Sequence, residues 1–223
     1  MSAEVTPPGS PIGERRYGGR SADERASDRL GRLLAAALDL FGEHGYAATS
    51  IEQLCSRAGV STRSFYHDVG SREALLRLLV TRLNSEGGLA CAEVLAEEND
   101  DSVVDRMAAA IRAYLSVTCS TRRHARVCYV EIVGVSTDIE LWRQRARESI
   151  VQMFGAEGRR AVERGEIAPR NFRLLIVAVI GAANLLAQEW AMSDVAASDT
   201  AEGADFRPFL DEIVALASAS LRA

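Results

Sequence analysis

The sequence predicts an all-α protein, and three observations support this fold class. The long middle of the chain is rich in Ala, Leu, Val, Arg and Glu, a composition that suits helices better than strands. Apolar residues recur there at three- and four-residue steps, which is the period of an amphipathic helix. Of the 223 residues 48% are hydrophobic, which is enough to build one ordinary domain and a smaller one, each with a packed core.

The first predicted element is a disordered arm, because residues 1–20 are rich in proline, glycine and serine. Ser21 and Glu24 then have the spacing of a capping box, which predicts that a helix begins at Ser21. Leucine, alanine and phenylalanine form one apolar stripe along this segment, and Gly45 supplies a C-terminal stop. We expect this helix to run to about Glu43.

Residues 50–66 contain every part of a helix-turn-helix. Ser50 and Gln53 form a second capping box, and the short helix that follows has one apolar face that is expected to pack inward. Gly59 lies where the chain must turn sharply, a place that favours a residue without a Cβ atom. Ser61 can cap the next helix, with Phe65 pointing into the core.

The second helix of this unit leaves a polar outer face, which is typical of a helix that enters the major groove of DNA. Arg63 is the candidate base reader, because an arginine there can bond a guanine bidentately and discriminate by about 1–3 kcal/mol. Neighbouring hydroxyls and a following arginine are suited to phosphates. The predicted DNA-contacting residues are Ser50, Ser61, Thr62, Arg63, Ser64, Tyr66, His67 and Arg72.

A longer pattern surrounds this unit, and it consists of LLAAALDLFGEHGY at 33–46, AGVS at 58–61, FY at 65–66 and SREALL at 71–76. This pattern resembles the DNA-binding head of the TetR family. The resemblance implies an all-helical homodimer whose three N-terminal helices bind DNA, and whose divergent C-terminal domain binds a small effector and dimerises. It also implies that Ser50 and Tyr66 contact phosphates, and that Arg72 stands at the family's phosphate-contacting lysine.

Two features of the head depart from the expected pattern. Asp68-Val69 stands where relatives usually show His-Phe, and the aspartate adds negative charge beside DNA. From Arg20 to Leu83 there are 9 arginines and 8 acidic residues, so attraction to DNA must come from their placement and should weaken with salt. These departures motivate an alternative, a helical ligand-binding protein that has lost DNA binding.

The chain is therefore expected to comprise an arm at 1–20, a helix-turn-helix domain at 21–83, and a larger effector-binding and dimerisation domain at 84–223. The basic cluster of the arm is interpreted as a solvated tail or as an extra DNA contact. Breaks in the apolar pattern divide the remaining residues into further helices, near 85–98, 102–120, 123–135, 139–164, 170–192 and 207–221.

The last two helices are the expected dimer interface, because Phe172–Met192 is apolar on nearly all sides. They resemble the pair through which family members form a four-helix interface, and two-fold symmetry then demands a palindromic operator.

The effector pocket is expected among the helices between Leu75 and Ala191, where aromatic, soft or polar groups interrupt apolar segments. The candidates are Tyr114, Cys128, Glu131, Trp142 and Asn184, and Cys119 and Tyr129 share this character. Ordinary core roles stay open for each of them. Glu131 meets a cationic ligand or faces water, and Asn184 bonds a ligand or sets register between subunits.

Several other classes of protein have little support in the sequence. Four dispersed cysteines without a CxxC favour a reducing cytoplasm over a disulfide framework. Cys119, His124 and Cys128 lack a further evident ligand, so neither a metal nor a cofactor is expected. No signal peptide is evident, and the apolar run 174–187 is shorter than a membrane span, so no membrane partner is expected. No enzyme signature is present, and catalysis has no positive support.

Overall fold

The computed structural model describes residues 22–97, 101–193 and 205–222. The predicted arm and the predicted cap at Ser21 lie outside these residues. Within them the chain is helical and has no strand, which confirms the all-α prediction. The elements are α1 (Ala22–His44), α2 (Ile51–Ala58), α3 (Thr62–Asp68), α4 (Arg72–Ala96), α5 (Val103–Thr118), α6 (Arg122–Arg126), the π-helical turn η1 (Val127–Glu131), α7 (Thr137–Glu163), α8 (Phe172–Met192) and α9 (Arg207–Arg222).

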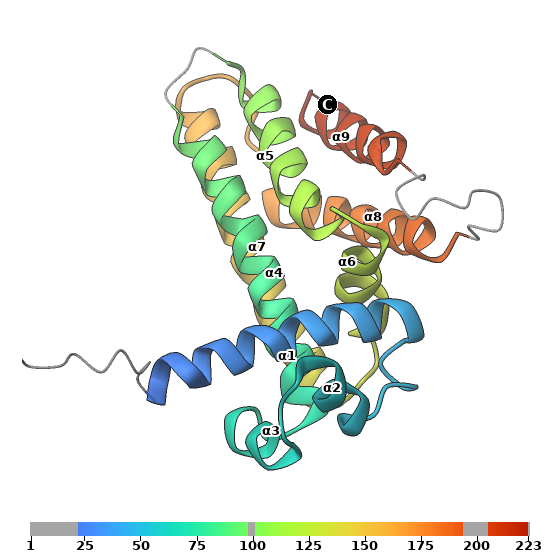
Figure 1. The fold of residues 1–223 in the computed structure, drawn as a ribbon. Helices are drawn as coiled ribbons and strands as arrows, with labels where there is room; N and C mark the ends of the chain where they lie inside the picture. Colours follow the sequence, from blue (N-terminus) through green and yellow to red (C-terminus); the bar gives the residue numbers. More distant parts are fainter. Residues whose placement is uncertain (1–21, 98–100, 194–204, 223) are drawn as a thin grey trace, which may run out of the picture.

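The first three helices form a small head with its own buried centre. Phe41 of α1, Leu54 of α2 and Phe65 of α3 are fully buried, as is Leu75 at the start of α4. Figure 1 shows α1 crossing the molecule, with α2 and α3 below it and α4 rising from the head into the larger helical part. The head is thus joined to the remaining helices by α4, which continues into the larger part, and by the packing of α1 against α6.

The turn between α2 and α3 has the predicted local geometry. The Ser50 hydroxyl accepts from the Gln53 N–H, and the Gln53 side chain accepts from the Ser50 N–H, so both halves of the capping box are present. Gly59 adopts φ 61° and ψ 40°, the left-handed conformation that residues with a Cβ atom rarely adopt. The Ser61 hydroxyl then accepts from the Ser64 N–H and starts α3.

The separate helix predicted from residue 85 is wrong, because α4 continues without a break from Arg72 to Ala96. Gly87 lies inside this helix and serves a packing role: a Cβ atom there would meet Cδ2 of Tyr114 on α5 at 3.0 Å. The glycine therefore allows α4 and α5 to approach closely, and it does not end the helix. The helix predicted over 123–135 also ends early, at Glu131, because Gly134 adopts a positive φ before Ser136 caps α7.

Helices α5, α7, α8 and α9 form the larger part of the molecule, beside the upper half of α4 (Figure 1). Among the described helices one, α8, is long and apolar enough to cross a membrane by length and composition alone. In the structure α8 packs between α7 and α9. Its outer side keeps several apolar residues exposed, among them Leu174 and Leu185.

Candidate nucleic-acid interface and effector cavity

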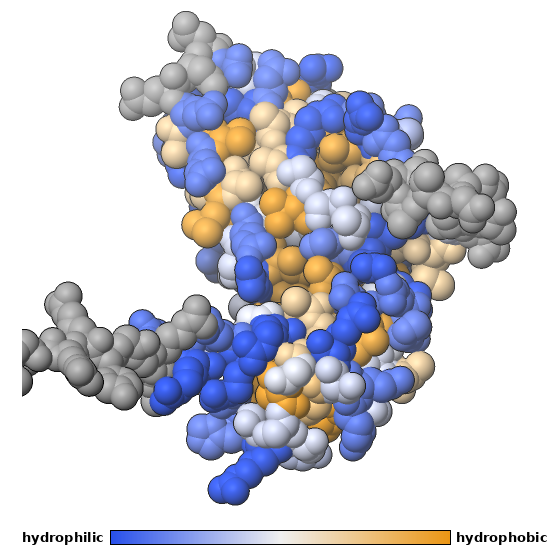
Figure 2. Space-filling model, viewed as in Figure 1, coloured by the Kyte–Doolittle hydropathy of each residue, from blue (hydrophilic) through white to orange (hydrophobic). Residues whose placement is uncertain are grey.

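The outer face of α3 carries the predicted reading surface. Thr62, Arg63, Tyr66 and His67 are exposed and Ser64 is half-buried, while Phe65 is buried against the head. Among the residues that the structure describes, none forms a hydrogen bond or ion pair with Arg63. In Figure 2, hydrophilic side chains gather over α1 and at the tip of the head near α3. Arg63 is therefore held on a fixed helix with its guanidinium open to solvent.

Ser50 and Ser61 are engaged as helix caps. The Ser50 hydroxyl oxygen lies 3.2 Å from the Gln53 nitrogen, and the Ser61 hydroxyl oxygen lies 3.1 Å from the Ser64 nitrogen. Both caps leave the first turns of α2 and α3 at the surface of the head. Backbone N–H groups at a helix start attract phosphates, so these turns suit a DNA backbone without sequence preference.

Arg72 begins α4 and connects it to the segment that precedes α2. Its Nη1 donates to the Thr49 carbonyl oxygen, and its guanidinium carbon lies 4.4 Å from the centre of the Tyr46 ring. The hydrogen bond and the cation–π contact hold this half-buried side chain between the two elements. Arg72 consequently has a packing role in the head, whatever it contributes to DNA contact.

Asp68 does not present its carboxylate to solvent. The side chain is only 6% exposed, and its oxygens accept from Nε and Nη2 of Arg29 at 2.7 and 3.2 Å. Nδ1 of His67 lies 2.8 Å from the same group. The Arg29 guanidinium, followed by His67, lowers the pKa of Asp68 to about 2. Because the charge is paired inside the head, this departure gives no support to a loss of DNA binding.

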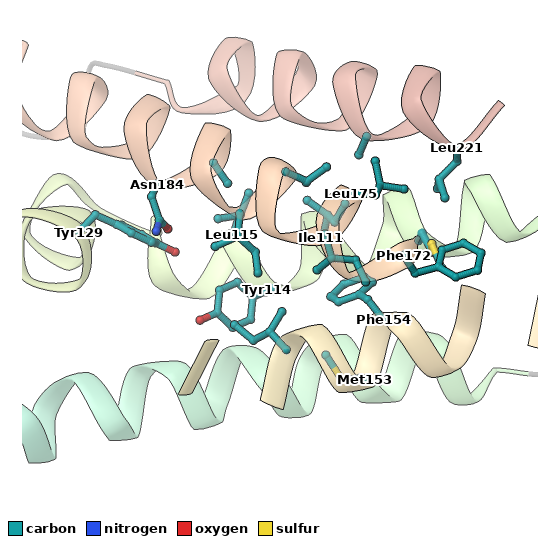
Figure 3. A pocket seen from close by; sticks show the side chains of 17 residues that line it. Ile111, Tyr114, Leu115, Tyr129, Met153, Phe154, Phe172, Leu175, Asn184 and Leu221 are labelled. Carbon is teal, nitrogen blue, oxygen red and sulfur yellow. The ribbon is translucent and has the colours of Figure 1, made fainter. Parts of the chain in front are cut away.

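A cavity of about 120 Å³ lies among α5, α7, α8 and α9. Figure 3 shows its side chains, which are almost entirely aliphatic or aromatic. They are Met107, Ile111, Tyr114, Leu115, Tyr129, Ile150, Met153, Phe154, Phe172, Leu175, Ile176, Val179, Ile180, Ala183, Asn184, Ala217 and Leu221. Such a lining suits an apolar molecule, with very few groups to orient its polar atoms.

The predicted effector residues divide into three sets. Tyr114 and Asn184 line both the apolar cavity and a smaller cavity beside it. Cys128 and Trp142 line the smaller cavity alone. Glu131 lines neither cavity, because its carboxylate is turned toward the head.

Sequence reasoning missed the apolar majority of the lining, such as Phe154 and Leu175. These residues follow the same helical spacing as ordinary core residues, so their positions in the sequence contain no signal for a cavity.

The η1 turn connects the cavity to the head. Tyr129 lines the cavity, and two residues later Glu131 accepts a hydrogen bond from the Tyr46 N–H at 2.6 Å. Arg126 Nε donates to the same carboxylate at 2.8 Å, and its Nη1 donates to the Glu43 carbonyl oxygen at 3.2 Å. Gly42 of α1 permits α6 to approach closely, because a Cβ atom at this position would lie 2.6 Å from Cβ of Arg123.

Two arginines of α6 join this helix to its neighbours. Arg122 donates to the Trp190 carbonyl oxygen, and Arg123 is paired with Asp39 and Glu43 of α1. No group of three potential metal-ligating side chains occurs within the described ranges 22–97, 101–193 and 205–222.

Two family models match the chain. The model of bacterial regulatory proteins of the tetR family matches residues 33–79, and the model of the tetracyclin repressor-like C-terminal domain matches residues 100–190. No match was found among curated proteins. The two models together cover the helix-turn-helix and most of the helices that surround the cavity.

Solved structures of low sequence identity share the fold. The fatty acid degradation regulator FadR from Bacillus halodurans is 16% identical, with a TM-score of 0.72 over 87% of this chain and 96% of that chain. FadR from Bacillus subtilis, solved in complex with stearoyl-CoA, is 15% identical, with a TM-score of 0.71 over 85% and 97%.

The TetR family regulator PfmR from Thermus thermophilus is 23% identical, with a TM-score of 0.62 over 82% of this chain and 97% of that chain. These solved structures share the fold of this chain, and the two family models, which agree with the helix-turn-helix geometry, show that it belongs to the tetR family of DNA-binding bacterial transcription regulators.

Proposed function

We propose that this protein is a homodimeric repressor that binds a palindromic operator and leaves it when a small molecule occupies the apolar cavity. Residues 21–83 bind DNA in this proposal, and residues 84–223 bind the effector and dimerise. The observation that carries the proposal is the position of η1 between the cavity and the head. Tyr129 of this turn lines the cavity, and Glu131 accepts a hydrogen bond from the Tyr46 N–H of the head.

Contact with DNA is assigned to the exposed side of the head. Arg63 reads a base in the major groove, because it is exposed, unpaired among the described residues, and placed in the first turn of α3. The remaining assigned residues position the head on phosphates or beside base edges. They are Ser50, Ser61, Thr62, Ser64, Tyr66, His67 and Arg72.

Dimerisation is assigned to α8 and α9. Leu174, Val177 and Leu185 lie on the outer side of α8 with exposed fractions of 66%, 38% and 58%, and Leu216 of α9 is 46% exposed. Gly181 is exposed on the same side of α8 and leaves room for a close helix partner. An apolar stripe of this kind is best covered by an equal stripe of a second copy.

The effector is proposed to be an elongated, mainly apolar molecule. The cavity lining supports this class, since the described residues that line it include no Asp, Glu, Lys or Arg. The likeness to two FadR structures, one of them solved with stearoyl-CoA, makes acyl compounds the first class to test.

Fluorescence anisotropy with labelled DNA from the region upstream of the protein's own gene tests the proposal. We expect selective binding over unrelated DNA, with affinity that falls steeply between about 50 and 200 mM salt. Addition of a suitable acyl compound should weaken operator binding by about 5–150-fold. Equal affinity for unrelated DNA, or operator binding by a monomer, would contradict the proposal.

A further inference from the structure

The few polar groups of the apolar cavity gather at one end. Figure 3 shows Tyr129 and Asn184 together at that end with Tyr114 near them, while Phe172 and Leu221 lie at the other end. The Tyr114 hydroxyl donates to Oδ1 of Asn84 at 3.0 Å, and the Tyr129 hydroxyl lies 2.7 Å from that of Thr118. A molecule in this cavity therefore meets hydrocarbon along most of its length and hydrogen-bonding groups at one end only.

A second cavity of about 80 Å³ adjoins this polar end. Five residues line both cavities: Tyr114, Tyr129, Ile150, Ile180 and Asn184. The second cavity also has Asn84 from α4, and Trp142, Arg143 and Arg147 from α7. The two cavities therefore share one wall, with hydrocarbon on one side of it and cationic side chains on the other.

The charged side chains among the described residues that line the second cavity are both arginines. Arg143 Nη1 lies 2.8 and 3.0 Å from the two oxygens of Glu140, so this arginine is already paired. Arg147 is exposed and forms no hydrogen bond with any residue that the structure describes. No Asp or Glu is among the described residues that line either cavity. Arg147 also lies within electrostatic range of Glu140, but its N–H groups make no bond to a described residue, so of the two arginines it is the one whose donors are available to an anion.

We infer that the effector is an amphipathic anion, whose apolar chain fills the larger cavity and whose anionic group binds Arg147 in the smaller one. A guanidinium suits a carboxylate or a phosphate, because its parallel N–H groups bond two oxygens at once. The inference rests on the proposed effector site. It adds the orientation of the ligand, with the anionic end beside η1 and the apolar end toward Phe172.

Binding of three probes with the same ten-carbon chain tests this inference: decanoate, decanol and decanoyl-CoA. Isothermal titration calorimetry on the full chain should give about tenfold tighter binding of an anionic probe than of decanol. A preference for decanoate assigns the site to a carboxylate, and a preference limited to decanoyl-CoA assigns it to the phosphates of a thioester carrier. Either preference supports the inference and identifies the source of the anion.

The Arg147→Gln variant should lose the preference for the anion and keep its affinity for decanol, and Arg147→Lys should retain part of that preference. Arg145→Gln is the matched control, because Arg145 is an exposed arginine of the same helix that lines neither cavity. The preference of Arg145→Gln for the anion over decanol should equal that of the unaltered protein. Thermal unfolding of each variant checks that the fold is intact.

Three results distinguish failure of this inference from failure of the proposed function. Equal affinity for decanol and for both anionic probes would overturn the anionic subsite and leave an apolar effector site standing. Equal loss of preference in Arg145→Gln and Arg147→Gln would also overturn it, because general charge attraction would then explain the data. Absence of binding by all three probes would overturn the effector site itself.

Discussion

Nε of Arg29 on α1 donates to Oδ2 of Asp68 at the end of α3 at 2.7 Å, across 39 positions of sequence. The second pair of atoms, Nη2 and Oδ1, lies 3.2 Å apart, so the contact is bidentate. A carboxylate at the end of α3 would repel DNA if it faced outward. Here it ties α3 to α1, and the orientation of the reading face depends on an ion pair as well as on Phe65 in the core.

Replacement of this carboxylate, Asp68→Ala, should destabilise the head, because it leaves the half-buried Arg29 without its partner. We expect the melting temperature at pH 7 to fall by a few degrees, measured by circular dichroism. Asp211→Asn is the control, because Asp211 pairs with Arg112 at an exposed site and such pairs contribute little.

The effect of Asp68→Ala on the melting temperature should depend on pH. Because the folded-state pKa of Asp68 is lowered from 3.8 to about 2, its stabilisation is complete above pH 3.8 and is lost as pH falls toward 2. The difference in melting temperature between the unaltered protein and Asp68→Ala should therefore shrink across this interval. A constant difference down to pH 2 would show that the side chain acts through packing rather than charge.

Loss of the exposed guanidinium in Arg63→Ala should relax sequence preference at one base pair in each half-site. The expected loss of discrimination is about 1–3 kcal/mol at that position, with affinity at other positions little changed. Anisotropy measured over a set of single-base operator variants checks this. Arg82→Ala is the control, because Arg82 is paired with Glu86 on the outer side of α4. Unchanged discrimination in Arg63→Ala would reject the assigned role.

How much of this arrangement could be predicted depends on the range of the interaction. The caps at Ser50 and Ser61 and the turn at Gly59 follow from residues a few positions apart, and each was predicted correctly. The pairing of Arg29 with Asp68 and the contact of Glu131 with Tyr46 join residues 39 and 85 positions apart. Local spacing contains no information on such contacts.

Two further features could not be predicted from the sequence, for reasons other than distance along the chain. Gly87 is a helix breaker by propensity, and its contact with Tyr114 explains its place inside α4 only once both helices are seen together. The cavity is lined by residues that also suit a filled core, so whether space remains between them depends on the packing of whole helices.

The hydrogen bond from the Tyr46 N–H to Glu131 is expected to transmit effector binding to the head, because one turn carries both this contact and cavity-lining Tyr129. The Glu131→Gln variant keeps the shape of the side chain and weakens its contact with Arg126. We expect the reduction in operator affinity caused by effector to become severalfold smaller, with effector affinity in the absence of DNA nearly unchanged.

Operator titrations with and without a bound acyl compound measure this coupling. Glu86→Gln is the control, because it removes a carboxylate from an exposed ion pair on α4. If the coupling in Glu131→Gln equals that of the unaltered protein, the signal reaches the head by another route, for which α4 is the next candidate because it spans both parts.

The exposed apolar stripe of α8 is the proposed dimer interface. Leu185→Arg places a charge where a second copy is proposed to pack, and desolvation of an unpaired charge in an apolar interface is costly. We expect light scattering to show a monomer in place of a dimer, with operator affinity reduced, because one head can bind only one half-site. Leu89→Arg is the matched control, since Leu89 of α4 is similarly exposed, at 65% against 58%, but lies outside the proposed interface. A dimer that persists in Leu185→Arg and dissociates in Leu89→Arg would move the interface from α8 to α4.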